Sequence, residues 1–129
     1  MYRPKQLKEN ADLSLRNIPV GMWGWILQRI TGLLLVFYLM LHILVVSVAM
    51  WGGQESFDRW MHGLHNPVLL TLELGLILTV IYHALNGLRI VLFDLGYGIR
   101  AQRQVFAAVM VLTALIFGYS LYVIVPYIY

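Results

Sequence analysis

Cysteine is absent from this chain of 129 residues. Disulfides, thiolate zinc sites and iron–sulfur clusters held by this chain alone are therefore excluded, because each of them needs cysteine ligands. Charge is also scarce, since 12% of the residues are charged, about half of what a soluble domain carries. Hydrophobic residues make up 60% of the chain, and this composition indicates a membrane protein.

Three long apolar runs account for this composition, at residues 22–51, 67–93 and 105–125. Each run reaches the roughly 20 residues that a transmembrane helix needs. We expect an all-α integral membrane fold, with residues 1–129 forming a single anchor domain of three transmembrane helices. The polar tail, the loop at 52–66 and the short turn at 94–104 leave no room for a soluble domain. Pro67 after Asn66 predicts the start of the second helix, and Gly96 and Gly98 predict its end.

The basic residues predict how the chain crosses the membrane. Eight of the nine Lys and Arg residues lie before or near the start of the first run, or around the turn between the second and third runs. Arg59 alone lies between the first and second runs. By the positive-inside rule the N-terminus is cytoplasmic and the C-terminus lies outside. This topology explains the net charge of +3 without a nucleic-acid partner. The eight are Arg3, Lys5, Lys8, Arg16, Arg29, Arg89, Arg100 and Arg103.

Two histidines, His42 and His83, lie inside the first and second runs. A polar ring in lipid is costly, so such residues usually face a bundle interior and serve a function there. Neutral imidazole is a common ligand for metals and for haem iron. The alternative is a structural histidine that bonds across to a neighbouring helix. Small residues on the same faces would allow a flat macrocycle or a second helix to approach. At three- and four-residue spacing, these faces carry Gln28, Thr31, Leu35, Tyr38 and His42, and Leu76, Thr79, His83, Gly87 and Ile90.

The depths of the two histidines differ. His42 lies 17 residues beyond Trp25, roughly 25 Å from the inner boundary, and His83 lies 11 residues before Asp94, roughly 16 Å from it. An offset of about 9 Å favours two different irons over one shared iron. Each iron would need a second ligand from elsewhere, so we expect a partner subunit that also supplies ligands.

Other ionisable residues fall within the predicted spans. Arg29 and Arg89 lie near the cytoplasmic boundary, where they either extend to the headgroups or bind haem propionates or a quinone carbonyl. Asp94 either accepts a hydrogen bond in the same layer or caps the helix at the membrane boundary. Glu73 lies roughly 10 Å inside the outer boundary, where a carboxylate is costly unless it is protonated, paired or close to water. It is a candidate for proton transfer or quinone contact, or a structural residue that faces a partner.

The stretches WGWILQRITG, YLMLHI and IYHALNGLRIVLFD resemble the cytochrome b subunits of succinate dehydrogenase, the C subunits of succinate:quinone oxidoreductases. The resemblance covers the first two helices and the three-helix layout, and HALNGLR followed by Asp is its most specific part. It implies that His83 ligates haem b. It also implies that Arg29 contributes to the quinone site near a haem propionate, and that Asp94 lies near the quinone pocket.

Three positions depart from or extend the common family pattern. Trp25 stands where many members have Ser, and Gln28 stands where they have His, so the inner quinone site is altered or uses Trp25. His42 resembles the outer haem ligand of the two-haem type, which has separate C and D anchors. This type is often associated with menaquinone, although ubiquinone stays compatible.

The resemblance implies a non-catalytic anchor and electron-transfer subunit of respiratory complex II in the tricarboxylic acid cycle. Its partners would be a D-type anchor, an iron–sulfur subunit and a flavoprotein, in a prokaryotic cytoplasmic membrane. Two alternatives stay open. One is the cytochrome b anchor of another quinone-linked reductase, such as fumarate reductase. The other is a non-redox scaffold in which His42, His83 and Glu73 form a polar relay.

Overall fold

The computed structural model describes residues 19–128, and within this range it contains helices and no strands. Four basic residues used for the topology, Arg3, Lys5, Lys8 and Arg16, lie outside the described residues. Helix α2 spans Val20–Leu64, α3 spans Pro67–Asp94, the short 3-10 helix η2 spans Ile99–Ala101, and α4 spans Gln102–Ile128. The predicted all-α class with three membrane-spanning helices is confirmed: the spans long and apolar enough to cross a membrane are Val20–Val48, Pro67–Asp94 and Ile99–Tyr127.

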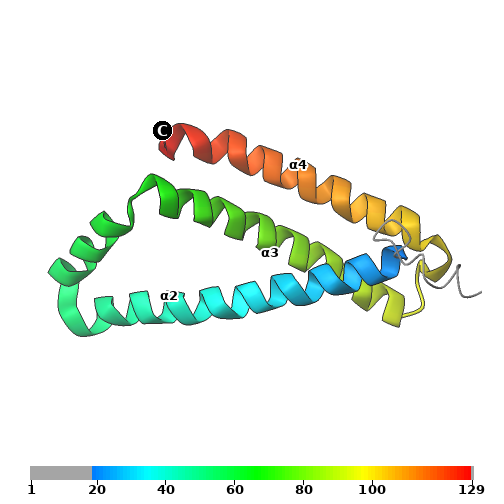
Figure 1. Cartoon of the computed structure of the whole chain (residues 1–129), viewed down its shortest axis with the longest axis horizontal. Coiled ribbons are helices and arrows are strands. Elements are labelled where there is room, and N and C mark those ends of the chain that lie inside the picture. The colour runs from blue at the N-terminus through cyan, green and yellow to red at the C-terminus, as the bar shows by residue number, and fades with distance from the viewer. Residues whose placement is uncertain (1–18, 129) are drawn as a thin grey trace, which may run out of the picture.

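Helix α3 is the central element of the bundle. It packs against both α2 and α4, whereas α2 and α4 make fewer contacts with each other. Figure 1 shows the start of α2 beside the turn that joins α3 to α4, and the end of α4 near the opposite end of the molecule. The three helices therefore run in alternating directions.

The helix ends follow from a few residues. Asn66 caps α3, since its side chain accepts a hydrogen bond of 2.8 Å from the Val68 backbone N–H, and Pro67 takes the first helical position. Gly96 and Gly98 adopt positive φ angles of 86° and 75° in the turn after α3. Residues with a Cβ rarely adopt this conformation, so the two glycines allow the chain to reverse into α4.

The segment after the first span differs from the prediction. Residues 52–66 were expected to form a loop, but α2 continues to Leu64 after a break at Gly53, where φ is 71° and ψ is −177°. Residues 54–64 form a helical segment with apolar side chains at Phe57, Trp60, Met61 and Leu64. This spacing lines one helical face, so the segment is amphipathic. We call it the amphipathic segment.

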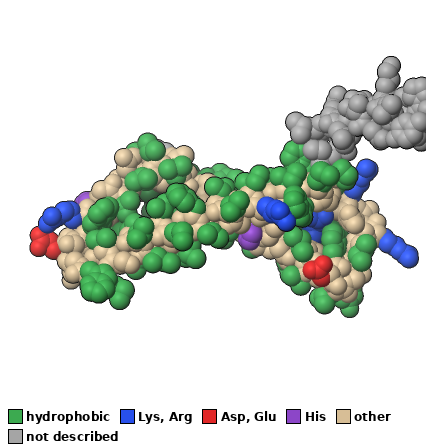
Figure 2. Space-filling view, turned by 60° about the horizontal axis from the view of Figure 1, so that its bottom comes forward, with side chains coloured by type: hydrophobic (Ala, Val, Ile, Leu, Met, Phe, Trp, Pro, Cys, Tyr) green, Lys and Arg blue, Asp and Glu red, His purple; other side chains and the backbone are tan. Residues whose placement is uncertain are grey.

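Most of the apolar surface of the chain is exposed. Only Tyr82 and Val109 are buried hydrophobic residues among those described. Figure 2 shows charged side chains toward the two ends of the visible face and hydrophobic side chains over most of the length between them. Such a surface suits lipid and neighbouring subunits, and the interior is correspondingly small.

Candidate functional site

The interior between the helices is polar at its centre. Asn86 is completely buried at 0% exposure, and Arg89 is 5% exposed. Together with Tyr82 they occupy positions i, i+4 and i+7 of α3, so they lie on one face of that helix. Polar side chains buried within a membrane-spanning helix are costly and usually functional, so this face is the candidate site.

Asn86 connects α3 to the start of α2. Its side-chain N–H groups donate to the Gly24 carbonyl at 3.0 Å and to Gln28 Oε1 at 2.9 Å, and its Oδ1 accepts from Arg89 Nη1 at 3.0 Å. Both polar atoms of this amide are therefore satisfied. Sequence reasoning missed Asn86; the available signal was its position three residues from both His83 and Arg89, which places all three on neighbouring faces of one helix.

His83 lies against the same part of α2 and is half-buried. Its Nδ1 is 3.0 Å from Thr31 Oγ1, and its Nε2 is 3.5 Å from Gln28 Nε2. A Cβ built on Gly32 would come within 3.2 Å of His83 Cε1, so the missing side chain lets the imidazole lie close to the α2 backbone. The structure thus brings together three predicted haem-site residues: His83, Gln28 and Thr31.

Gly87 is also part of this contact. A Cβ at Gly87 would lie 3.4 Å from Gln28 Nε2, so a side chain there would crowd the Gln28 amide. The glycine lets Gln28 extend across the α2–α3 interface to reach both Asn86 and the region of His83.

Arg89 carries a buried charge that has no acidic partner among the described residues. Its guanidinium lies 4.8 Å from the Phe93 ring centroid and 5.3 Å from that of Phe106 on α4, and its Nε has no hydrogen-bond partner. Within residues 19–128 the one ion pair is Arg59–Glu55 in the amphipathic segment, at 3.2 Å. Aromatic faces stabilise a cation only in part, so Arg89 is suited to an anionic group.

Tyr82 presents a second buried polar atom without a partner. Its side chain is 6% exposed, and the hydroxyl forms no hydrogen bond with the described residues. Sequence reasoning did not select Tyr82, because a tyrosine beside a histidine in an apolar run resembles ordinary packing.

The predicted quinone residues are only partly brought together. The Arg29 guanidinium lies 3.9 Å from the Trp25 ring centroid, and both side chains are exposed on α2. Asp94 is exposed at the end of α3, and no hydrogen bond or ion pair joins it to either residue in the described part of the chain. Trp25 and Arg29 therefore form one exposed pair, and Asp94 stands apart from it.

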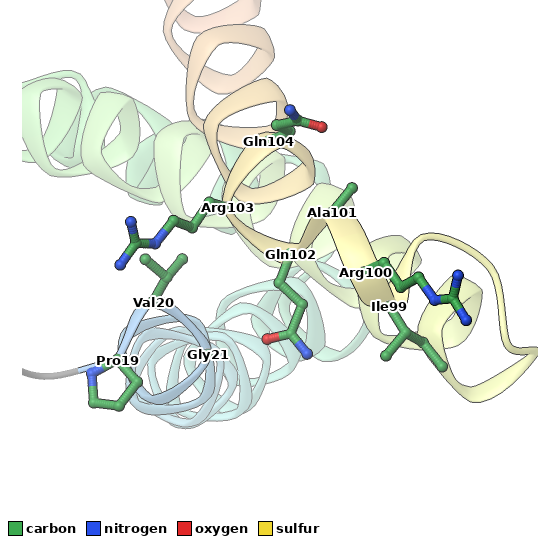
Figure 3. Close-up of a pocket in the computed structure, with 9 residues that line it drawn as sticks. All are labelled: Pro19, Val20, Gly21, Ile99, Arg100, Ala101, Gln102, Arg103 and Gln104. Carbon is green, nitrogen blue, oxygen red and sulfur yellow. The ribbon is translucent and has the colours of Figure 1, made fainter.

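A cavity of about 480 Å³ lies where α2 begins and α4 begins. Figure 3 shows Arg100 and Arg103 pointing in different directions around it, with Gln102 directed toward Gly21. Trp25, Arg29 and Asp94 do not line it, so this cavity is separate from the predicted quinone residues.

His42 lies in a different environment from His83. It is exposed, its ring stacks on Tyr38 with centroids 5.6 Å apart, and Tyr38 Oη lies 3.4 Å from its Nδ1. His83 is level with Thr31, and His42 follows Thr31 by eleven residues, which is roughly 16 Å along the helix. The two imidazoles thus occupy separate levels of the bundle. Their separation exceeds the roughly 9 Å expected from the sequence, because that expectation placed Trp25 and Asp94 at one depth, whereas His83 lies beside Thr31.

Glu73 lies on the exposed surface of α3, within the span Pro67–Asp94, and makes no ion pair in the described part of the chain. The described residues contain no group of three or more His, Cys, Asp or Glu side chains placed to hold a metal ion. A metal at His42 or His83 would therefore take its remaining ligands from another molecule or from a macrocycle.

These features define an integral membrane protein of three helices with a polar centre around a histidine. Residues 3–120 match the family described as succinate dehydrogenase/fumarate reductase transmembrane subunit. The chain belongs to this family and is a membrane anchor subunit.

Curated relatives agree with this assignment. A succinate dehydrogenase hydrophobic membrane anchor subunit of Halobacterium salinarum is 40% identical over 97 residues, 74% of each chain. A succinate dehydrogenase 2 membrane subunit of Mycobacterium tuberculosis is 34% identical over 84 residues, 64% of this chain and 61% of the relative. A succinate dehydrogenase cytochrome b558 subunit of Bacillus subtilis is 30% identical over 67 residues, 51% of this chain and 33% of the relative.

Proposed function

We propose that this anchor subunit binds haem b through His83 and His42 and transfers electrons between an iron–sulfur subunit and a membrane quinone. The observation that carries the proposal is the half-buried His83, whose Nδ1 bonds to Thr31 within a polar cluster of two membrane helices. A neutral imidazole oriented through its other nitrogen is the usual form of a metal-ligating histidine. The cytochrome b558 name of the Bacillus subtilis relative is consistent with haem b.

The residues present fit a haem at His83. His83 offers an imidazole whose Nδ1 lies within hydrogen-bonding distance of Thr31, and Arg89 is a buried cation without an acidic partner among the described residues. Arg89 and Arg29 are the candidates to pair with propionates, because guanidinium binds carboxylates through paired N–H groups. Bound haem b would supply one-electron transfer between donors and acceptors on the two sides of the site.

Two haems explain the two levels better than one. The levels of His83 and His42 lie roughly 16 Å apart along the helix axis, which is too far for both rings to bind one iron. Tyr38 would then support His42 at the outer level through their ring contact. Each iron would take its second ligand from the D-type anchor subunit.

The quinone would bind near the cytoplasmic end. Trp25 and Arg29 form an exposed cation–π pair there, and Asp94, the third residue of the proposed site, lies at the end of α3. This pair offers an aromatic face and a hydrogen-bond donor to a quinone head group. Menaquinone is the quinone favoured by the two-haem type. Glu73 is the candidate for proton transfer at the outer side.

The assembly would include a flavoprotein that oxidises succinate and an iron–sulfur subunit docked at the cytoplasmic face. The described chain offers no cysteine for clusters. Its role would therefore be non-catalytic: it holds haem, contributes to the quinone site and anchors the soluble subunits in a prokaryotic cytoplasmic membrane. Quinol oxidation with fumarate reduction uses the same components in reverse.

Haem content per purified complex tests the proposal. We expect two haems b in the wild type by the pyridine haemochromogen assay, with one lost in His42→Ala and the other in His83→Ala, because each histidine would hold a different iron. A complex with one haem, lost only in His83→Ala, would reduce His42 to a packing role. A complex that contains no haem, or keeps both in His83→Ala, would refute the proposal.

A further inference from the structure

In the polar cluster between α2 and α3, the donor and the acceptor of each hydrogen bond can be assigned in turn, starting from Arg89. A guanidinium only donates, so the Asn86 atom 3.0 Å from Arg89 Nη1 must be the carbonyl oxygen. A backbone carbonyl only accepts, so the Asn86 atom 3.0 Å from the Gly24 carbonyl must be the amide nitrogen. These two contacts together fix which side-chain atom of Asn86 is the oxygen and which is the nitrogen.

This assignment passes to Gln28. The Asn86 amide nitrogen also lies 2.9 Å from Gln28, and it can only donate there, so the Gln28 atom facing it is the oxygen. The Gln28 amide nitrogen is then the atom directed at His83, 3.5 Å from its Nε2 and 3.4 Å from its backbone carbonyl. Because an amide N–H only donates, it favours an unprotonated His83 Nε2.

An independent contact reaches the same conclusion from the other side of the ring. The Thr31 hydroxyl lies 2.7 Å from the Leu27 carbonyl and 3.1 Å from the Gln28 carbonyl, and it donates its only hydrogen to these backbone acceptors. Its oxygen can therefore only accept from His83 Nδ1, at 3.0 Å. The proton of neutral His83 lies on Nδ1, and the lone pair lies on Nε2.

We infer that Thr31, Gln28 and Asn86 are positioning residues that hold His83 in the tautomer with its proton on Nδ1 and Nε2 free to ligate a metal. The inference rests on the proposed haem function. The Gln28 contact with Nε2 is at the long limit of a hydrogen bond, and the same amide has the His83 carbonyl as a second acceptor. Gln28 can thus release Nε2 without leaving its own N–H groups unpaired. Residues that hydrogen-bond to a metal-ligating side chain affect metal affinity by about 10- to 100-fold.

Two substitutions at one position separate this role from simple packing. In Gln28→Glu the atom that faces His83 Nε2 becomes an acceptor, which favours the wrong tautomer. We expect the purified complex to lose haem to apomyoglobin about tenfold more readily than the wild type. Gln28→Leu removes the donor but favours neither tautomer, and Thr31 still accepts from Nδ1, so we expect haem loss to increase by less than in Gln28→Glu. A packing role predicts the opposite order, because Leu leaves an Asn86 N–H without its acceptor. Equal effects, or a larger loss in Gln28→Leu, would overturn the inference.

A second pair of variants decides the matter if Gln28→Glu fails to assemble. Thr31→Val removes the hydrogen-bond acceptor for Nδ1–H, so the imidazole would donate its Nε2 electron pair to iron less strongly. We therefore expect the midpoint potential of the His83-dependent haem to rise. Thr31→Ser keeps the hydroxyl and should restore the wild-type potential. An unchanged potential in Thr31→Val would overturn the inference. The proposed function would still stand if one haem is lost in His83→Ala. Full haem content in His83→Ala overturns both.

Discussion

Arg89 on α3 restricts which residue can stand at position 24 of the facing helix α2. Its guanidinium occupies the space where a side chain at position 24 would lie, so a Cβ on Gly24 would overlap Arg89 Nη1 and lie 3.4 Å from Arg89 Cζ. Gly24 also supplies the carbonyl that accepts from Asn86. The absence of one side chain on α2 therefore allows a charged residue to be buried on α3.

At this scale we predict that Gly24→Ala destabilises the protein. The new methyl group forces Arg89 away from its bond to Asn86, and overpacking of this kind costs about 1–3 kcal/mol. The gain of roughly 1 kcal/mol in helix propensity from Gly to Ala offsets part of this cost. The apparent Tm of the purified complex should fall.

Gly21→Ala provides the matched control for that measurement. It lies one turn earlier on α2, and its Cβ would meet only Gln102 Oε1, at an ordinary contact of 3.6 Å. Its Tm should match or slightly exceed that of the wild type. Equal Tm values for the two variants would contradict the steric argument.

The individual residues of the cluster were predictable to different degrees. His83, Gln28 and Thr31 could be grouped from helical spacing, and the structure brings them into contact. Asn86 was not singled out, because an asparagine in a helix often faces outward and its burial depends on where α2 crosses α3. Periodicity gives the face of each helix but not the point at which two faces meet.

At the scale of elements, the break at Gly53 separates the first span from the amphipathic segment. The three spans follow from the apolar runs, which any sequence reading detects. The helical form of residues 54–64 was not predicted, because the charged residues Glu55, Asp58 and Arg59 are typical of a loop. The spacing of Phe57, Trp60, Met61 and Leu64 was the available signal, since it repeats at three and four residues.

We predict that Gly53→Ala loosens the amphipathic segment. With φ at 71° and ψ at −177°, position 53 adopts a conformation that is nearly restricted to glycine and costs other residues about 1–3 kcal/mol. Trypsin cleavage after Arg59, an exposed site in this segment, should become on the order of tenfold faster, because cleavage requires local opening of the helix.

Gly63→Ala is the control for the cleavage experiment. Its Cβ would meet nothing within 4 Å, and its φ is not positive. We expect its cleavage rate to stay at or below that of the wild type. If Gly53→Ala is cleaved no faster than Gly63→Ala, the break does not hold the segment in place.

At the scale of the whole molecule, α3 lies between α2 and α4 and contributes most of the buried polar side chains. The positive-inside rule predicts that the α3–α4 turn lies in the cytoplasm and the amphipathic segment outside. The orientation follows from the charges of the sequence, whereas the central position of α3 depends on packing that the sequence pattern does not show.

Cysteine labelling tests this orientation directly, because the native chain has no cysteine to react. We expect a membrane-impermeant maleimide to label Gln54→Cys on intact cells, and Tyr97→Cys only in inverted vesicles. Both native side chains are exposed, Gln54 at the start of the amphipathic segment and Tyr97 in the α3–α4 turn. Labelling of Tyr97→Cys on intact cells would reverse the assigned topology.

The burial of Asn86 also bears on how the chain enters the membrane. If α3 entered lipid alone, Asn86, Arg89 and His83 would face hydrocarbon, and each would raise the cost of insertion. Beside α2, the Asn86 amide finds the Gly24 carbonyl and Gln28, and Arg89 is covered. The first span therefore lowers the cost of inserting the second. We expect it to remain at the translocon until α3 has emerged, so that the two helices enter the lipid together as a hairpin.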